Sequence, residues 1–520
     1  MSLVNLLMIA LAALGVALVA VEIYFVSRKS ESRLAQAARI GLALAAIINI
    51  VLVVFLVLNQ IGFPLHLDLM EGVVLQHFQR AANGESIYPE PSPAYAPLAY
   101  NGFFYIFSIP FGWVFGVNLP TLRLVSLLGM LGSGLVIFRV VQEKTRSLWW
   151  GLIGAGLFAA AYGAMDAYLN TAHSDSWLLF SALLGAYLID RDRSRAWNIA
   201  GLVLLVAAFW FKQHGALFAI GGVAFLTWRE LGKAGWINGL RRSIPYWIIA
   251  ILLGPVLYIF AGPALFGSHF HYFTWEVPRN WTELNLNTFV RYGKFIARNY
   301  FFLALAGGLL VLWAVIRDRK QFDMWHTFFV FACLSGFMGA LDPGSSDNVF
   351  IPMGAAFILL GVMGLYELSV RVTVARQNRL YLLALFFSFA LLLYDPRPFV
   401  TSPQAGGSYN ELVSMLNALD GPVYGPWQGQ LPRDYELYPT PHWVALEDMI
   451  RGPGRDTRNH PNTRQLLDPA INPQGPAYIL ANYTLDIYPW LEFLNDYYVI
   501  ETDFEDRFSA LRTLPKRWDH

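Results

Sequence analysis

Charged residues are scarce in this chain. Only 14% of its 520 residues are Asp, Glu, Lys or Arg, and 56% are hydrophobic, whereas a soluble domain averages about 25% charged residues. The sequence therefore predicts a polytopic membrane protein rather than a soluble one. At this hydrophobicity the spans must be helices, because the strands of a membrane barrel would alternate polar and apolar residues. The net charge of +1 indicates no nucleic-acid partner.

Cysteine is almost absent as well. The single cysteine, Cys333, lies within an apolar run, so the sequence excludes an intrachain disulfide. The apolar run at residues 3–26 is too long for a cleaved signal peptide and has no positive charge ahead of it. We therefore expect it to be a membrane span. The sequence shows neither low-complexity segments nor internal repeats.

Long apolar runs fill most of the first 395 residues. Runs of about 20 apolar residues predict transmembrane helices, and shorter ones are weaker candidates. There are thirteen candidates: 3–26, 40–62, 98–117, 120–141, 147–165, 175–190, 197–211, 213–228, 244–264, 299–316, 324–340, 348–368 and 379–395.

Six of the connectors between these runs are basic, which predicts that they face the cytoplasm. They are residues 28–39, 144–146, 191–195, 229–242, 317–320 and 371–379. Neighbouring basic connectors must then be separated by an even number of crossings. The count is odd only between Arg39 and Lys144, so one run there does not cross. The weakest is 98–117, which contains Asn101, Pro110 and many aromatics. We expect about twelve spans, with 98–117 lying at the outer face.

This topology places the unusual polar stretches on one side of the membrane. The first external loop, residues 63–119, contains "HLDLMEGVVLQHFQRAANGESIYPEPSPAYAPLAY". The same face receives "DAYLNTAHSDSW", "FKQHGA", "FVRYGKFIAR" and "LDPGSSDNVF". Residues 1–395 are expected to form the transmembrane domain. Residues 396–520 are rich in Pro, Asp, Arg and Tyr and are expected to form a small external α/β domain, with short strands in "GPAYILANY" and "DYYVIETDF" and a helical "WLEFLN" between them.

Three acidic residues in two regions of the sequence are candidates for catalysis. Asp68 and Glu71 are three residues apart, which puts both carboxylates on one helix face. Asp68 can also simply cap the helix that ends at Gly84. Near an apolar boundary, however, a carboxylate has a raised pKa and can act as a general base. Asp175, with His173, begins a span on the same face and is either a helix cap or a second carboxylate opposite the first.

Cations on the same face are candidates for binding phosphate. Lys212 occupies a tight turn together with His214, and its alternative role is a side chain that snorkels to the membrane surface. Arg291, Lys294 and Arg298 follow one another at helical spacing in an aromatic-rich amphipathic stretch, which can also anchor the chain to anionic lipid. Cations beside carboxylates favour an anionic lipid headgroup as ligand.

A transporter or flippase of lipid-linked saccharide is the alternative function. Transporters tend to carry ionisable residues at mid-membrane and broken helices in corresponding halves. Here the span interiors are nearly free of charge, with Glu22 as the main exception. Polar residues that gather at one face favour an enzyme working at the outer surface.

These motifs resemble the GT-C membrane glycosyltransferases, a class whose first external loop bears a catalytic acid. The resemblance is to the bacterial branch of lipid A galacturonosyltransferases, aminoarabinose transferases and protein O-mannosyltransferases. It rests on the first-loop stretch, "LRLVSLLG", "HSDSW", "FKQHG" and "PGSSDNVFIP", which occur in family order over residues 60–370. Two features depart from the family pattern: His173 and Ser174 stand where relatives often have an arginine, and an extra span precedes the first loop.

The resemblance implies an all-α GT-C-like fold and an inverting transfer from a polyprenyl-phosphate sugar donor to a hydroxyl of a glycan, lipid or protein. It implies Asp68 as the base, with Glu71 as its competitor and Asp175 as a further catalytic acid. It also implies Lys212, with Arg291, Lys294 and Arg298, as phosphate ligands. Candidate contacts to sugar or acceptor are Tyr88, Tyr95, His173, His214, Asp347 and Asn348. We expect no metal, although Asp68 and Asp175 could together hold a divalent ion. The predicted location is a bacterial inner membrane, with the site facing the periplasm or exterior.

Overall fold

The structure is a computed structural model of the whole chain. It describes residues 33–317, 319–372, 379–425 and 441–451, with short stretches at 427, 466, 478–481 and 504–514 and isolated positions between 13 and 23. The predicted span 3–26, with Glu22, therefore lies largely outside the described residues. So do the predicted strand "DYYVIETDF", apart from Phe504, and the predicted helix "WLEFLN".

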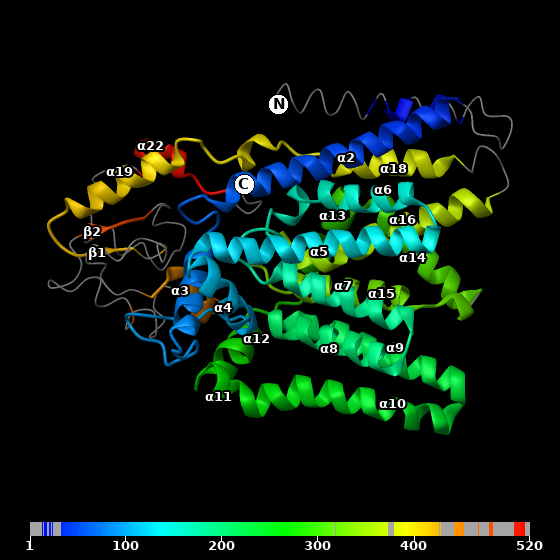
Figure 1. Ribbon diagram of the computed structural model, residues 1–520, viewed down its shortest axis with the longest axis horizontal. Helices are drawn as coiled ribbons and strands as arrows, with labels where there is room; N and C mark the ends of the chain where they lie inside the picture. The colour runs from blue at the N-terminus through cyan, green and yellow to red at the C-terminus, as the bar shows by residue number, and fades with distance from the viewer. Residues whose placement is uncertain are drawn as a thin grey trace.

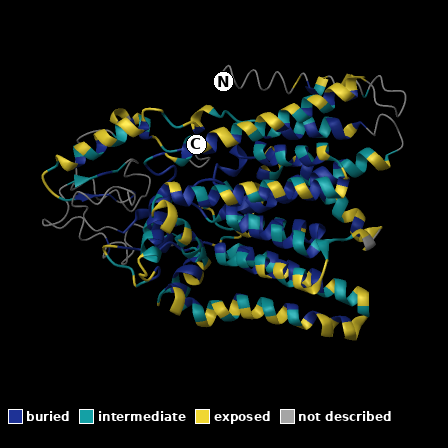
Figure 2. Ribbon diagram, viewed as in Figure 1, coloured by how far each residue is buried: buried dark blue, intermediate teal, exposed yellow. Residues whose placement is uncertain are grey.

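Long apolar helices lie side by side along the horizontal axis of Figure 1 and form a bundle. Their buried faces point into the bundle, and the exposed faces of α2 and α10 lie on its outside (Figure 2). The helices of the bundle are α2 (Arg33–Ile61), α5 (Leu119–Thr145), α6 (Leu148–Ala160), α7 (Asp175–Arg191), α8 (Arg195–Phe211), α9 (Ala216–Ala234), α10 (Trp236–Ile251), α14 (Phe301–Ile316), α15 (Met324–Ala340), α16 (Ile351–Arg371) and α18 (Leu380–Leu391). The chain is thus an all-α integral membrane protein over this region.

In the described part of the chain, fewer helices are long enough to cross a membrane than the apolar runs predicted. Four helical stretches in the described part of the chain are long and apolar enough to cross a membrane: Arg33–Ile61, Leu119–Thr145, Trp236–Phe266 and Asp347–Arg371. A fifth is a pair, α13 (Leu286–Asn299) and α14, bent by 102°. Several other apolar helices have only 10–17 residues. The expected total of about twelve spans is therefore not confirmed.

Basic connectors gather at one end of the bundle, which we call the basic end. Lys144 forms ion pairs with Asp190 at 2.8 Å and Asp323 at 2.6 Å. Arg191 pairs with Glu143, and Arg371 donates to Gln321 at 3.1 Å. These contacts join four connectors that are far apart in the sequence. They agree with the prediction that the basic connectors share one side.

The chain between α2 and α5 leaves and re-enters the bundle at the opposite end, which we call the site end. Arg123, near the start of α5, donates to the carbonyl of Phe63 just beyond α2, at 2.6 Å. Between them lie α3 (Glu71–Ala82) and the 13-residue α4 (Phe103–Phe115), both at this end in Figure 1. Helix α4 therefore stays at the site end of the bundle. The even number of crossings required between basic connectors predicted the same for run 98–117. Helix α3 ends just before Gly84, whose φ of +72° fits the predicted C′ glycine.

The helix that follows α10 widens near the site end. Residues Leu252–Ala261 (η3) form a π-helix that contains Pro255. Proline lacks the N–H that an α-helix needs at this position, and π-turns within helices often accompany functional sites. The segment continues as α11 (Gly262–Phe266), η4 (Tyr272–Glu276) and α12 (Val277–Arg279).

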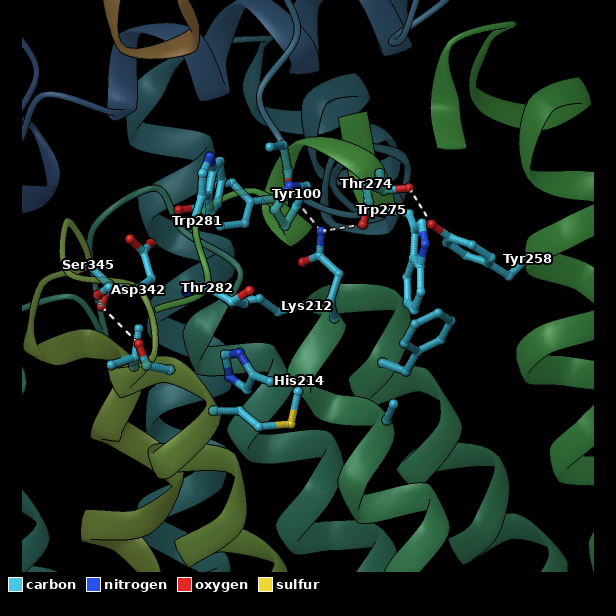
Figure 3. A pocket seen from close by; sticks show the side chains of 18 of the residues that line it. Tyr100, Lys212, His214, Tyr258, Thr274, Trp275, Trp281, Thr282, Asp342 and Ser345 are labelled. Atoms are coloured by element: carbon cyan, nitrogen blue, oxygen red, sulfur yellow. Dashed lines mark hydrogen bonds between the residues drawn. The ribbon is translucent and has the colours of Figure 1, made fainter. Parts of the chain in front are cut away.

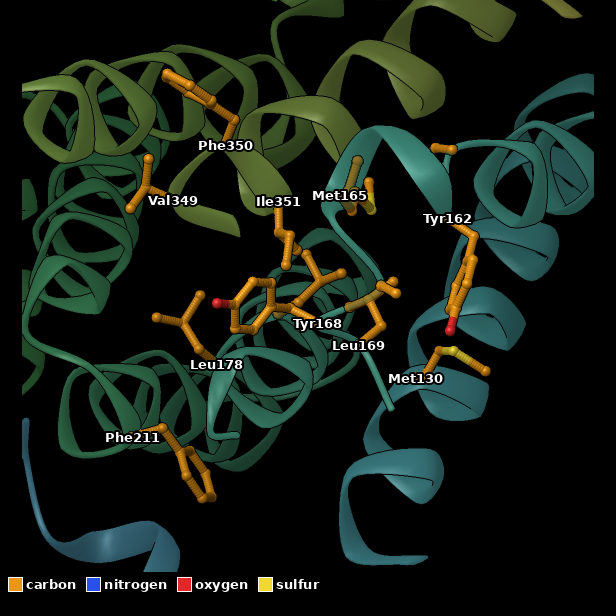
Figure 4. Close-up of a cluster of buried hydrophobic side chains, with 14 of the residues drawn as sticks. Met130, Tyr162, Met165, Tyr168, Leu169, Leu178, Phe211, Val349, Phe350 and Ile351 are labelled. Atoms are coloured by element: carbon orange, nitrogen blue, oxygen red, sulfur yellow. The ribbon is translucent and has the colours of Figure 1, made fainter. Parts of the chain in front are cut away.

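The packed core directly below the site end is shown in Figure 4. Tyr168 and Leu169 lie in the loop between α6 and α7, and Figure 4 shows Tyr168 beside Ile351, the first residue of α16. All three side chains are buried. Within this loop Asp166 and Ala167 have φ of 51° and 57°, a left-handed conformation that side chains other than glycine adopt at a cost. Asp166 is held in place because its Oδ2 accepts the N–H of Asp347 at 3.0 Å.

The C-terminal segment packs on the site end. It contains α19 (Ala405–Asn417), β1 (Val423–Tyr424), α20 (Trp443–Ile450), β2 (Tyr478–Ile479) and α22 (Phe504–Arg507). The two strands are parallel, with Val423 opposite Tyr478, and β2 falls within the predicted strand "GPAYILANY". Gly72 allows this packing, because a Cβ there would lie 2.5 Å from the carbonyl of Trp427.

Candidate active site

Glu71 forms a buried ion pair that joins the first loop to the bundle. Arg123 donates from Nε and Nη2 to the two oxygens of Glu71, at 3.1 and 2.6 Å. The same carboxylate accepts the N–H groups of Leu67 at 2.6 Å and Ala172 at 2.8 Å. Both side chains of the pair are almost fully buried. Each oxygen of Glu71 therefore already accepts two hydrogen bonds.

Arg123 also closes the end of α2. Its two terminal nitrogens donate to the carbonyls of Phe63 and Leu65, each at 2.6 Å. Carbonyls beyond a helix end have no partner within the helix. The sequence offered a signal for this role, since Arg123 and Arg139 are the only charges within the apolar run 120–141, but the role of Arg123 was not predicted.

Asp68 lies one turn before α3. Its Oδ1 accepts the N–H of Met70 at 2.7 Å, which stabilises the turn ahead of α3. The N-cap of α3 is Met70 and has no side-chain cap, so the structure does not show the helix-capping role that the sequence left open for Asp68. Its Oδ2 lies 2.9 Å from Nε2 of His173. His173 packs edge-on against Tyr168, with ring centroids 4.7 Å apart. The structure thus joins two of the predicted site residues, one from the first loop and one from the start of α7.

Lys212 forms a second buried ion pair at the same end. Its Nζ lies 2.8 Å from Oδ1 of Asp175, and both side chains are buried. Oδ2 of Asp175 accepts from Asn348 at 3.3 Å. The ammonium also lies 5.2 Å from the ring centroid of Tyr100, a cation–π distance. Three predicted site residues, Lys212, Asp175 and Asn348, therefore meet although they come from three different parts of the chain.

A cavity of about 1370 Å³ begins at Lys212 and Tyr100. Figure 3 shows Tyr258 and Trp275 on one side of it and Asp342 and Ser345 on the other. Leu69 and Met70 contribute to its wall, whereas Asp68, His173 and Asp175 are not among the lining residues. Asp68 and Asp175 each contact a lining residue, Met70 and Lys212 respectively.

An apolar groove extends from this polar end between α9 and the α10–η3 helix. Its walls include residues that face outward, such as Ile220, Trp247 and Ile251, each about half exposed. The groove therefore opens sideways. The remaining apolar lining residues here are Val206, Ala216, Ala219, Val223, Ala250, Gly254, Pro255 and Ile259.

His214 borders the cavity next to Lys212. Burial, aided by the charge of Lys212, lowers the pKa of His214 to about 3, so the ring is neutral. Its Nε2 is buried, with no hydrogen-bond partner in the described structure. A buried ring nitrogen at a cavity wall is suited to bind a ligand group.

The C-terminal segment supplies part of the cavity wall. Arg451, at the end of α20, pairs with Asp342 and with Asp448, each at 3.1 Å. Its guanidinium stacks 3.8 Å from the ring centroid of Trp281, and the indole N–H of Trp281 donates to the carbonyl of Asp448 at 2.9 Å. Val444, Glu447, Asp448 and Arg451 all line the cavity.

Comparison with protein-family models gave no match, and comparison with curated proteins gave none either. Among solved structures, the chain is similar to ArnT from Cupriavidus metallidurans. The apo crystal structure has 14% sequence identity over 82% of this chain and 94% of that chain, with a TM-score of 0.48. The structure bound to undecaprenyl phosphate has 15% identity over 78% and 84%, with a TM-score of 0.38.

ArnT is an aminoarabinose transferase of the GT-C type, the kind of neighbour that the sequence resemblance predicted. Both TM-scores lie below 0.5, so what the site does has to follow from its own residues.

The remaining predicted residues lie away from the cavity lining. Arg291 holds the turn after α15, donating to the carbonyl of Asp342 at 2.9 Å and to that of Ser345 at 2.5 Å. Its distance to Asp347 is 3.8 Å. Lys294 and Arg298 are exposed on α13. The structure therefore brings Arg291 to the rim of the site but does not place Lys294 or Arg298 in it.

Tyr88 and Tyr95 are buried within the first loop. The hydroxyl of Tyr88 donates to the carbonyl of Tyr100, and that of Tyr95 donates to Ile87 at 2.9 Å. Both rings pack around His77, whose Nε2 accepts the N–H of Leu98 at 3.0 Å. These contacts hold the loop together, and neither tyrosine lines the cavity.

The sequence led us to expect no metal, although Asp68 and Asp175 could together hold a divalent ion. Within the described ranges, no group of three or more His, Cys, Asp or Glu residues is arranged to hold an ion. Asp68 and Asp175 are each paired with a different residue, His173 and Lys212. Metal dependence stays a matter for experiment.

Proposed function

We propose that this protein is an inverting glycosyltransferase that moves a sugar from a polyprenyl-phosphate donor to a hydroxyl of a glycan, lipid or protein. The observation that carries this proposal is the shape of one cavity. A buried lysine stands at its polar end, and an apolar groove leaves it sideways between α9 and α10. A phosphate headed by a sugar and followed by a long hydrocarbon chain fits both parts.

In the proposed mechanism Lys212 binds the donor phosphate, and the isoprenoid chain lies in the groove. The acceptor oxygen attacks the anomeric carbon on the side opposite the phosphate, and the bond to the phosphate oxygen breaks. The leaving group is a phosphate monoester, which a cation can stabilise without a strong acid. The proton of the acceptor hydroxyl goes to Asp68.

Asp68 is the proposed base because it directly precedes Leu69 and Met70, which line the cavity, whereas each oxygen of Glu71 already accepts two hydrogen bonds. His173 orients Asp68 through the 2.9 Å contact. Since Leu69 and Met70 lie between Asp68 and the cavity, the loop at 69–70 must shift when the acceptor binds. In the same proposal the site end faces the periplasm or exterior, and residues 396–520 form a domain outside the membrane.

A transporter of lipid-linked saccharide would use the same cavity to move its substrate across the membrane. The buried charged pairs described above lie at the site end, and the pairs of the basic end are partly exposed, whereas carriers place ionisable groups at mid-membrane. This placement favours the transferase.

The test uses the purified full chain in nanodiscs with undecaprenyl phosphate. Ala219→Trp fills the groove and should weaken binding of this lipid strongly, whereas Ile237→Trp, on the outer face of α10, should not. A donor carrying a radiolabelled sugar should then transfer it to a hydroxyl acceptor from the envelope of the source cell. Equal lipid binding by both tryptophan variants would refute the assignment of the groove. Movement of labelled donor across vesicles without any transfer would favour the transporter.

A further inference from the structure

The part of the cavity wall formed by α20 of the C-terminal segment and by the turn after α15 carries an excess of negative charge. Three acids line this part, Asp342, Glu447 and Asp448, against a single cation, Arg451. Lys212, the other cation of the lining, is already paired with Asp175. Both polar centres act on Tyr100, since the charges of Asp448, Arg451, Asp342 and Asp175 all influence its hydroxyl.

One carboxylate oxygen in this wall has unmet hydrogen-bonding capacity. Oδ1 of Asp448 pairs with Arg451, but Oδ2 is buried with no hydrogen-bond partner in the described structure. The residue is only 4% exposed and lines the cavity. A buried oxygen without a partner is costly in a folded protein, and a ligand donor would remove that cost.

Burial raises the pKa of Asp448 to about 7, and the neighbouring acids Asp342 and Glu447 raise it further against the opposing charge of Arg451. This carboxyl can therefore take up or release its proton near neutral pH. A ligand that donates a hydrogen bond or brings a positive charge favours its ionised form. A ligand with a carboxylate of its own would add a fourth negative group to the wall and would be repelled.

We infer that this wall is the sugar-recognising part of the site and that Asp448 and Glu447 select a donor whose sugar bears hydroxyl or amino groups and no carboxylate. This inference rests on the proposed function and narrows it. It assigns to α20 a direct contact with the transferred sugar. It favours neutral and amino sugars over uronic acids, a choice that the sequence left open.

The test measures binding to the full-length protein in nanodiscs of undecaprenyl phosphate alone and of the same lipid carrying a neutral hexose, an amino sugar or a hexuronic acid. The neutral or the amino donor should bind at least about tenfold more tightly than the uronic donor, the scale of one charge-assisted hydrogen bond. Asp448→Asn and Glu447→Gln should each reduce that ratio several-fold, while binding of undecaprenyl phosphate alone stays unchanged. Glu411→Gln, an exposed change in α19, should leave the ratio unaltered.

The pH dependence separates the two favoured sugars. Binding of an amino donor should weaken between pH 8 and pH 6 as Asp448 takes up a proton, whereas binding of a neutral donor should change little. A uronic donor that binds as tightly as the others, or a ratio that neither variant alters, would overturn the inference. Failure of the proposed function would look different, since undecaprenyl phosphate alone would then not bind to the wild-type protein.

Discussion

Arg123 and Glu71 form a two-pronged ion pair at the junction of the first loop and the bundle, with Nη2 of the arginine 2.6 Å from Oε2 of the glutamate. Glu71 is three residues from the candidate base Asp68, and neither residue of the pair lines the cavity. Its position connects the end of α2, the start of α3, helix α5 and the loop before α7. We therefore assign the pair to positioning, and this assignment can be separated from catalysis by experiment.

Glu71→Gln should lower stability more than chemistry. Removing one partner of a buried ion pair costs roughly 3–5 kcal/mol, so thermal unfolding in detergent should begin at a clearly lower temperature. Glu85→Gln is the matched control, because its pair with Arg80 is half exposed. An unchanged unfolding temperature together with abolished turnover would instead make Glu71 the base.

Asp68→Asn should have the opposite profile. A positioned general base contributes about 10²–10⁴ in rate, while the amide can still accept the N–H of Met70. We expect turnover to fall on that scale, with the unfolding temperature and the affinity for undecaprenyl phosphate near those of the wild type. Near-normal turnover would remove Asp68 from the mechanism and move attention to His173.

The Lys212–Asp175 pair predicts that substitutions of its two members change the affinity for undecaprenyl phosphate in opposite directions. Lys212→Ala removes the phosphate ligand and should weaken binding of undecaprenyl phosphate by roughly tenfold or more. Asp175→Asn removes the competing carboxylate and should strengthen it. Isothermal titration of both variants checks this, with Lys294→Ala on α13 as the control cation. Weaker binding by Lys294→Ala together with unchanged binding by Lys212→Ala would show that the wrong cation was chosen.

Asp448 predicts a dependence of stability on pH. Its folded pKa of about 7 lies above the ordinary value of 3.8, so the folded state binds its proton more tightly than the unfolded state does. The stability that this group contributes is present below pH 3.8 and is lost as the pH rises through 7. Asp448→Asn should therefore unfold at a higher temperature than the wild type at pH 8, with a smaller difference at pH 5. A constant difference across this range would contradict the raised pKa.

The topology predicts opposite accessibility of two connectors. In a Cys333→Ser background, cysteine at Ser194, between α7 and α8, should be labelled from the cytoplasmic side of sealed vesicles. Cysteine at Gln404, before α19, should be labelled only from the other side. Labelling of both from one side would contradict the separation of the basic end from the site end.

Much of the helical layout could be predicted because it is local. The run 175–190 became α7 at Asp175–Arg191, with an acid at its start and a base at its end, the arrangement that the helix dipole favours. The non-crossing α4 was found from charge parity, although its own residues are as apolar as those of a span. Helix length was not predictable in the same way, since short bundle helices and long ones have similar composition.

The contacts within the site were less predictable. Lys212 and Asp175 were each recognised, but no local pattern shows that a turn after α8 meets the start of α7. Arg123 was missed because a charge in an apolar run is meaningful only once its partner is known. The residues of α20 that line the cavity were not identified, because the short, mostly apolar stretch "WVALEDMI" carries no local pattern that shows what it packs against.

The sideways opening of the groove has a consequence for how substrate and product exchange. Each methylene group of a lipid chain that leaves hydrocarbon for water costs about 0.8 kcal/mol, so drawing a polyprenyl chain out of the bilayer is prohibitive. A groove whose mouth is formed by half-exposed residues of α9 and α10 allows the chain to slide in from the bilayer with its tail still in hydrocarbon. Under the proposed function, the lipid donor would then reach the protein by lateral diffusion within the membrane. The spent carrier would leave by the same route, so its crowding in the membrane, rather than its concentration in water, would set product inhibition.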